Sequence, residues 1–146
     1  MKRLTAVTLV GAATMLFAAS AEGGALRFLQ TPDRNIGCAL FKAGKRSHGN
    51  VRCDINDHTW VPPAGKQCAA GFGDGVELRE RGRGHYNCPH DSVVGLGPVL
   101  QPGASASKDR FTCTVTQAGP TAFGVSCINR RNRHGFDLTP STVNLY

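Results

Sequence analysis

The chain has 146 residues, with 17 lysines and arginines against 10 aspartates and glutamates, and a formal net charge of +7 at pH 7. This length provides one domain with a modest core and excludes two independent ones. Hydrophobic residues make up 40% of the chain and recur in short ordered frames, which excludes a disordered polyelectrolyte and is typical of a secreted globular domain.

The N-terminus has the organisation of a secretory signal peptide. Lys2 and Arg3 form a basic start, an uncharged run covers residues 4–19, and Ala19-Ser20-Ala21 supplies the small residues of a cleavage site. The apolar run is about 16 residues long and a spanning helix needs roughly 20, so a retained membrane anchor is the less favoured alternative. The first cysteine comes only at position 38, which disfavours a lipoprotein anchor.

We therefore expect residues 1–21 to be a signal peptide that is cleaved near Ala21, leaving no transmembrane anchor. Residues 22–146 then form a single secreted or periplasmic domain. Without the two basic residues of the leader, its net charge is about +5.

Short strands are predicted along the rest of the chain, because apolar residues alternate at period two as in a half-buried strand. A frame of apolar-x-Cys-x-apolar covers residues 36–40, 51–55 and 111–115, and Tyr86-x-Cys88 and Val125-x-Cys127 begin in the same way. Cys68 lacks this frame and is predicted to lie in a loop. Other strands are expected at residues 26–29, 58–61, 76–79, 92–94 and 136–138.

Turns and loops separate these strands. Gly-rich or Pro-containing turns are predicted at residues 43–50 and 117–121, and a surface loop at residues 101–107. Gly or Pro interrupts nearly every window, so no segment sustains a helical period. The expected fold is an all-β, small disulfide-stapled domain of short antiparallel hairpins.

Six cysteines in an exported chain indicate a disulfide framework, although fifteen pairings are possible. A turn lies between Cys38 and Cys53, and another between Cys113 and Cys127, so each of these pairs is expected to occupy the two arms of one hairpin. Nearest-neighbour pairing then predicts the disulfides Cys38–Cys53, Cys68–Cys88 and Cys113–Cys127. The echo of Gly49-Asn50-Val51-x-Cys53 in Phe123-Gly124-Val125-x-Cys127 hints at duplicated hairpins.

A longer pattern resembles a family of small exported bacterial domains of unknown function. Its opening, F-x-(S/T)-P-x-x-N-I-x-C, corresponds here to Phe28 through Cys38, with Asp33-Arg34 where the family pattern has Ser-Gly. The similarity continues through Val51-Arg52-Cys53-Asp54-Ile55, Trp60-x-Pro62, Cys68, Cys88-x-x-Asp91-x-Val93, Gly124-Val125-x-Cys127-x-Asn129 and His134-Gly135-Phe136-x-Leu138. This resemblance implies export and disulfides over residues 28–146, and it implies no catalytic residue.

Catalytic and metal motifs are weak in this sequence. Cys53-x4-His58 and Cys88-x-His90 have the spacing of metal ligands, but cysteines in an oxidising compartment are normally used in disulfides, so we expect no metal and no cofactor. His85 or His134 with Asp91 offers acid–base chemistry, although nothing in the spacing brings them together. Trp60 is either a small platform for a glycan or peptide or, the favoured interpretation, a core residue.

Two basic clusters carry the strongest functional signal. One loop contains Arg79, Arg81, Arg83 and His85, and a second contains Arg130, Arg131 and Arg133. Arginine guanidinium groups pair well with phosphate, sulfate and carboxylate groups. The alternative is a solvated surface that only keeps the protein soluble. Placement of the two loops close together on one face would favour anion binding.

The sequence therefore predicts a non-catalytic, exported binding domain. Its expected partner is an anionic envelope polymer such as lipopolysaccharide or teichoic acid, or an extracellular protein, without recognition of a specific nucleic acid. A secreted protease inhibitor is the second candidate, because Arg81 or Arg83 suits a trypsin-like pocket. A small hydrolase that uses histidine and aspartate is the third.

Overall fold

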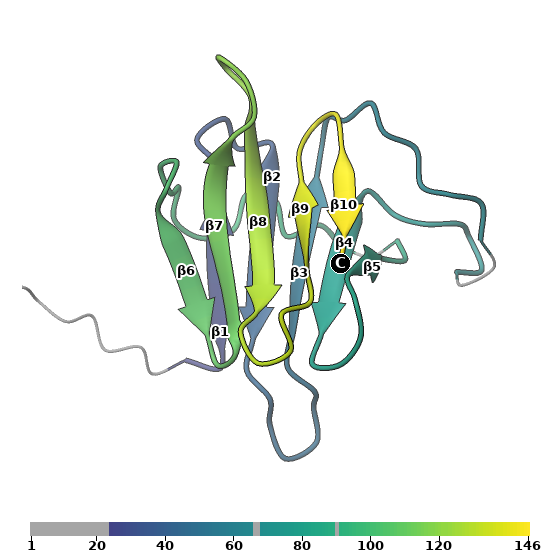
Figure 1. Ribbon diagram of the computed structural model, residues 1–146, viewed down its shortest axis with the longest axis vertical. Helices are drawn as coiled ribbons and strands as arrows, with labels where there is room; N and C mark the ends of the chain where they lie inside the picture. Colours follow the sequence, from purple (N-terminus) through teal and green to yellow (C-terminus); the bar gives the residue numbers. More distant parts are fainter. Residues whose placement is uncertain (1–23, 66–67, 90) are drawn as a thin grey trace, which may run out of the picture.

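The alternation of apolar and polar residues produces two antiparallel sheets that pack face to face (Figure 1). The computed structural model describes residues 24–65, 68–89 and 91–146, and these residues form ten strands and no helix. The first sheet contains β1 (Leu26–Gln30), β2 (Ile36–Phe41), β3 (Asn50–Ile55), β4 (Gly75–Arg79) and β5 (His85–Tyr86). The second sheet contains β6 (Ser105–Lys108), β7 (Phe111–Gln117), β8 (Phe123–Asn129), β9 (Gly135–Leu138) and β10 (Val143–Leu145). The predicted all-β fold of antiparallel hairpins is confirmed.

The second sheet repeats the topology of the first. Each sheet is a meander in which every strand pairs with the next one in the chain. The second and third strands of each sheet carry the cysteines of one hairpin, with Cys38 opposite Cys53 and Cys113 opposite Cys127. The sequence echo between the two hairpins therefore corresponds to a repeat of five strands.

The inward side chains of both sheets form one core in which the two hairpin disulfides lie at the centre. Cys38, Cys53, Cys113 and Cys127 have no exposed surface, and Cys53 Sγ lies 3.7 Å from Cys127 Sγ across the sandwich. The remaining fully buried core side chains are Leu29, Ile36, Leu40, Val51, Val76, Leu78, Phe111, Val115, Phe136 and Leu138.

All three predicted disulfides are confirmed. The Cys38–Cys53 and Cys113–Cys127 bonds join directly opposite residues whose Cα atoms are 4.1 Å apart. Cys68–Cys88 joins the long connection before β4 to the segment after β5. Three disulfides and no free cysteine indicate an oxidising, extracytoplasmic environment. The predicted signal peptide, residues 1–21, lies outside the described residues, and these contain no helix long and apolar enough to span a membrane.

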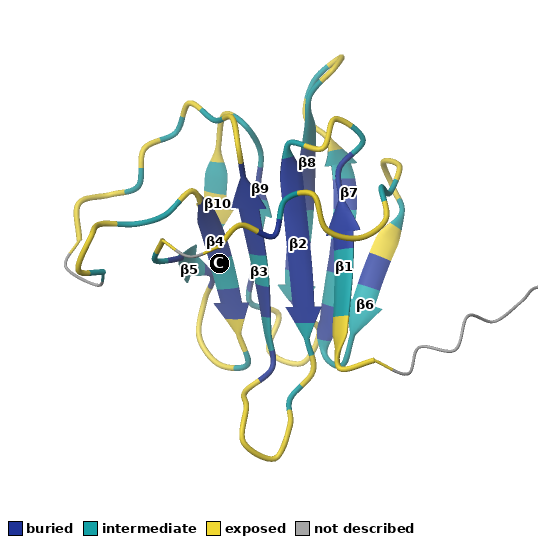
Figure 2. Cartoon of the chain, turned by 180° about the vertical axis from the view of Figure 1, so that it is seen from behind, coloured by how far each residue is buried: buried dark blue, intermediate teal, exposed yellow. Residues whose placement is uncertain are grey.

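The connection from β5 to β6 crosses the outer face of the first sheet, as Figure 2 shows in front of β2 and β1. Asp54 fixes its start, since the carboxylate accepts hydrogen bonds from the Val93 backbone N–H (2.9 Å) and from Asn87 Nδ2 (2.8 Å). Gln30 fixes its end through Gly95 N–H and the Gly97 carbonyl. This crossover explains why Asp54 and Gln30 are buried although they point away from the core.

The errors in the predicted strands lie in the long connections and in the edge strands of the second sheet. Residues 92–94 belong to the crossover and form no strand, because their backbone binds side chains of the sheet below. Residues 58–61 are also irregular, and Trp60 packs at the margin of the core as predicted, with its Nε1 donating to the Thr139 carbonyl. Part of the predicted 101–107 loop is strand β6, and β10 was not predicted. Both are edge strands; β6 has little apolar sequence and β10 has only three residues, so their formation depends on the neighbouring strand.

The opening pattern of the resemblance, residues 28–38, contains the turn between β1 and β2. The Thr31 hydroxyl donates to Asp33 and accepts the N–H of Ile36, while Asn35 exchanges two hydrogen bonds with the backbone of Asp57. Arg34 has a φ of +56°, a left-handed conformation that favours glycine. A glycine at this position would adopt this conformation without strain.

Candidate anion-binding end

Four connecting segments meet at one end of the sandwich, the lower end in Figure 1. They are residues 42–49 between β2 and β3, 79–84 around the β4–β5 loop, 108–110 at the end of β6 and the turn to β7, and 130–134 between β8 and β9. We call these four segments together the basic end. The two arginine loops predicted from the sequence, at residues 79–85 and 130–133, are therefore neighbours.

The side-chain amides of two asparagines shape the second arginine loop. Asn129 Oδ1 accepts the backbone N–H of Arg131, and Asn132 Oδ1 accepts that of His134, which closes two consecutive Asx turns. The Nδ2 groups of both asparagines donate to the Glu80 carbonyl, at 3.1 and 3.2 Å. The asparagines thus hold the two arginine loops against each other.

A glycine allows this close approach. A Cβ atom on Gly84 would lie 2.8 Å from the Gly135 carbonyl oxygen, so any side chain there would push the β4–β5 loop away from β9. Gly82, at the tip of the same loop, has a φ of +85°. Glycine adopts this positive φ without strain because it has no Cβ atom.

The Glu80 side chain connects neighbouring segments of the basic end. Its Oε1 accepts the Gly49 backbone N–H at 3.1 Å and lies 3.6 Å from Arg110 Nη2, while its Oε2 lies 3.9 Å from His48 Nδ1. Through its side chain and its carbonyl, Glu80 contacts the other three segments of the basic end.

The basic end concentrates most of the positive charge of the protein. Its two carboxylates are those of Glu80 and Asp109. Eleven of the 17 lysines and arginines belong to it: Lys42, Lys45, Arg46, Arg79, Arg81, Arg83, Lys108, Arg110, Arg130, Arg131 and Arg133. The opposite end carries the exposed carboxylates of Asp33, Asp57 and Asp74 with the single described cation Arg34.

Four of the predicted arginines are exposed and available. Arg81, Arg83, Arg131 and Arg133 are exposed, and none of them forms an ion pair with a carboxylate of the described residues. Arg130 is also exposed, but its guanidinium donates to the carbonyl of Asp109 and so fixes the β6–β7 turn. Free guanidinium groups on adjacent loops are suited to several anionic groups of one ligand.

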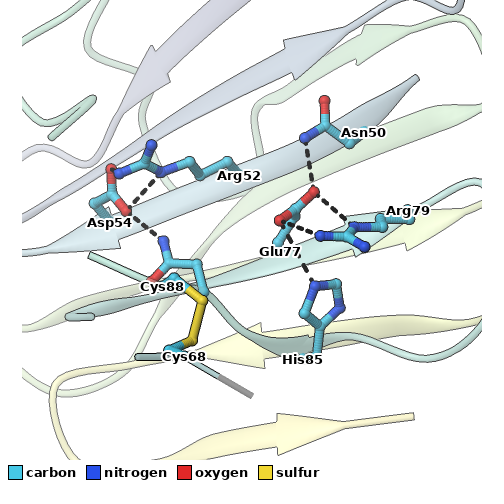
Figure 3. Close-up of polar contacts among 9 residues, drawn as sticks. Asn50, Arg52, Asp54, Cys68, Glu77, Arg79, His85 and Cys88 are labelled. Atoms are coloured by element: carbon cyan, nitrogen blue, oxygen red, sulfur yellow. Dashed lines mark hydrogen bonds and ion pairs between the residues drawn. A yellow bond between two sulfur atoms is a disulfide. The ribbon is translucent and has the colours of Figure 1, made fainter. Parts of the chain in front are cut away.

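The other two predicted residues, Arg79 and His85, instead surround Glu77 on the outer face of the first sheet (Figure 3). Arg79 Nε donates to Glu77 Oε1 at 3.1 Å, Asn50 Nδ2 donates to the same oxygen at 2.9 Å, and His85 Nε2 lies 3.6 Å from Oε2. Burial raises the pKa of Glu77, but the hydrogen bonds from His85, Arg79 and Asn50 and the charge of Arg79 outweigh it and lower the pKa to about 2.

This environment gives Glu77 a pH-dependent role in stability. A carboxyl group whose pKa falls on folding, here from 4.5 to about 2, stabilises the fold above pH 4.5 and loses that effect as the pH falls toward 2. We expect E77Q to lower the free energy of unfolding at pH 7 by about 1 to 2 kcal/mol, allowing for solvent screening. Urea unfolding at several pH values should show the difference shrinking below pH 4.5. A difference that stays constant down to pH 2 would contradict this role.

The histidine and aspartate set expected for a hydrolase is not brought together. His85 faces Glu77, the Asp91 carbonyl accepts a hydrogen bond from Arg52, and His134 lies in the β8–β9 loop. Among the described residues, no hydrogen bond or ion pair joins any two of His85, Asp91 and His134.

The residues with metal-ligand spacing have other contacts. His58 stacks on Trp60 with ring centroids 3.8 Å apart, and its Nε2 lies 3.2 Å from Asp74 Oδ1, whereas His90 lies outside the described residues. The sulfurs of the four core cysteines lie within 4.8 Å of one another, a spacing that would suit a metal ion. Each is bonded in a disulfide, so none supplies the thiolate that a metal requires.

Several residues of the basic end were missed as site residues. The segment 43–50 is visibly basic in the sequence, yet its glycines and position indicated only a turn. Lys42, Lys108 and Arg110 are isolated in the sequence and join the cluster only because the strand ends converge. The signal that could have found them is the antiparallel register, which places every second connection at the same end of a meander.

Comparison of the chain with protein-family models, with curated proteins and with solved structures finds no match. The motif resemblance therefore stays a prediction.

Proposed function

We propose that this protein is an exported, non-catalytic binding domain that recognises anionic polymers of the bacterial envelope through its basic end. In this proposal residues 1–21 direct export as a cleaved signal peptide, and residues 22–146 act in the periplasm or outside the cell. The observation that carries the proposal is the packing of the two arginine loops against each other through Asn129, Asn132 and Glu80.

The charge distribution supports the same proposal. A cluster of like charges costs stability through self-repulsion, so a surface that only keeps the protein soluble gains nothing from concentrating them at one end. Here four adjacent segments contain eleven lysines and arginines and two carboxylates, an excess of nine positive charges. A ligand with many negative charges would neutralise this repulsion on binding.

The shape of the β4–β5 loop favours binding of a polymer over inhibition of a protease. An inhibitor presents a protruding, extended loop to its target, whereas Gly84 is buried against β9 and the loop turns sharply at Gly82. Arg81 and Arg83 are thus displayed on a short turn beside a second basic loop.

Binding to purified lipopolysaccharide and teichoic acid, measured at increasing salt, tests the proposal. We expect the affinity to fall by about tenfold or more between 50 and 200 mM salt, because each charged contact releases counterions. Neutral dextran serves as the control polymer and should not bind. Affinity that is insensitive to salt, or equal for dextran, would refute the proposal.

A further inference from the structure

Two hollows of the basic end lie one at each base of the β2–β3 hairpin loop, and a larger hollow that both Lys42 and His48 line lies beside them. The first has a volume of about 290 Å³ and is lined by Lys42, where the loop leaves β2, and by Ser107, Lys108, Asp109 and Arg130. The second has a volume of about 390 Å³ and is lined by His48, just before the loop returns to β3, and by Arg79, Glu80 and Arg81.

The first hollow gathers three cations from three different elements: the end of β2, the end of β6 and the β8–β9 loop. Neither Lys42 nor Lys108 forms an ion pair with a described carboxylate. The carboxylate of Asp109 faces Arg110 Nε at 3.6 Å, and Arg130 donates to the Asp109 carbonyl, which orients its guanidinium group. Three cations with one carboxylate that already has a partner form a niche for one phosphate, sulfate or carboxylate group.

The second hollow has a smaller excess of positive charge, with two arginines and one carboxylate. Arg81 is exposed and has no ion pair among the described residues, and Arg79 keeps most of its side chain in solvent (63% exposed) while it contacts Glu77. Glu80 Oε1 accepts the Gly49 N–H and lies 3.6 Å from Arg110 Nη2, and its Oε2 lies 3.9 Å from His48, which lines the same hollow. The hollow thus offers arginine groups to a second anionic group.

The contact between Glu80 and Gly49 fixes the base of the loop that separates the hollows. Because this hydrogen bond ties the loop to Glu80, directly after β4, the spacing of the two hollows is set before any ligand binds. Two sites at a fixed spacing favour a ligand that carries several charges on one chain, since occupation of the first site raises the effective concentration at the second.

We propose that the basic end binds a linear polyanion that occupies both hollows at once, and that affinity depends on chain length. This inference rests on the proposed function and specifies its ligand as a chain rather than a membrane surface. A protein that binds a membrane surface is expected to insert exposed apolar side chains into it. Among the described residues the exposed large apolar side chains are Leu26, Val61 and Leu96, of which only Leu26 lies at this end, with 37% of its surface exposed.

Polyphosphate of different lengths tests the inference. We expect long-chain polyphosphate to bind at least about tenfold more tightly, per phosphate, than tripolyphosphate at the same salt concentration. K42Q/K108Q removes two charges from the first hollow and should abolish this gain, as should R81Q, which removes the arginine without an ion pair from the second. R34Q/T121D makes the same change of two charges at the opposite end and should keep the gain.

The outcomes separate this inference from the proposed function. Salt-dependent binding without a gain from chain length, or an equal effect of R34Q/T121D and K42Q/K108Q, would overturn the two-hollow inference alone. Binding to vesicles of anionic phospholipid that matches polyphosphate charge for charge and ignores K42Q/K108Q would also overturn it in favour of a lipid surface. Failure to bind any polyanion would overturn both.

Discussion

Replacing Cys113 and Cys127 together by alanine is expected to lower the free energy of unfolding by about 3 to 5 kcal/mol, and C38A/C53A by a similar amount. Each disulfide closes a loop with a sequence separation of 14 or 15 residues, which in the chain-entropy model is worth about 3 kcal/mol. The four sulfurs also fill the centre of the core, so their removal leaves a cavity between the sheets.

The third disulfide is the matched control. Cys68–Cys88 has a sequence separation of 20, so chain entropy predicts nearly the same loss, but Cys68 and Cys88 are partly exposed and lie outside the core. C68A/C88A should therefore cost less than either hairpin pair in urea unfolding under identical conditions. A larger loss for C68A/C88A would show that packing between the sulfurs of the two sheets contributes little.

Removing the four free arginines is expected to have the largest effect on binding. R81Q/R83Q and R131Q/R133Q should each weaken binding to lipopolysaccharide or teichoic acid by about tenfold, and the quadruple variant by about a hundredfold, near 50 mM salt. The salt dependence should become shallower with each pair, because fewer counterions are released. These side chains are exposed and form no ion pair with described residues, so folding should be unaffected.

The position of the charges, and not only their number, decides this result. R34Q/T121D lowers the net charge by two at the end opposite the arginine loops. It should leave the affinity within about twofold of the unaltered protein. If R34Q/T121D weakens binding as much as R81Q/R83Q, the ligand responds only to total charge, and the basic end is not a site.

The fold was predictable where apolar and polar residues alternate along the sequence. The frames around Cys38, Cys53 and Cys113 place the sulfur and its apolar neighbours on one face, and this pattern determined both strands and pairing. Residues 92–94 have the same apolar character but cover a sheet from outside, with Val93 buried against Gly37. A pattern of buried residues does not distinguish these two situations, because both bury the same side chains.

The candidate site was predictable only in part. The two arginine loops are visible as runs in the sequence, but their contact depends on the single residues Gly84 and Asn132, which carry no charge. Lys42 and Lys108 are 66 positions apart in the numbering and line one hollow because two strands end side by side. Such a site is created by topology, and local sequence patterns do not contain it.

The separation of charge along the sandwich also has a kinetic consequence. With cations at the end that carries the 42–49 and 130–134 loops and the carboxylates of Asp33, Asp57 and Asp74 at the other, the molecule has a large electric dipole along its strands. In the field of a negatively charged polymer, this dipole turns the protein before contact, so that most encounters begin with the arginine loops in front. If the protein binds such a polymer as proposed, the arrangement would speed capture at low salt, and added salt would slow association by shortening the range of the field.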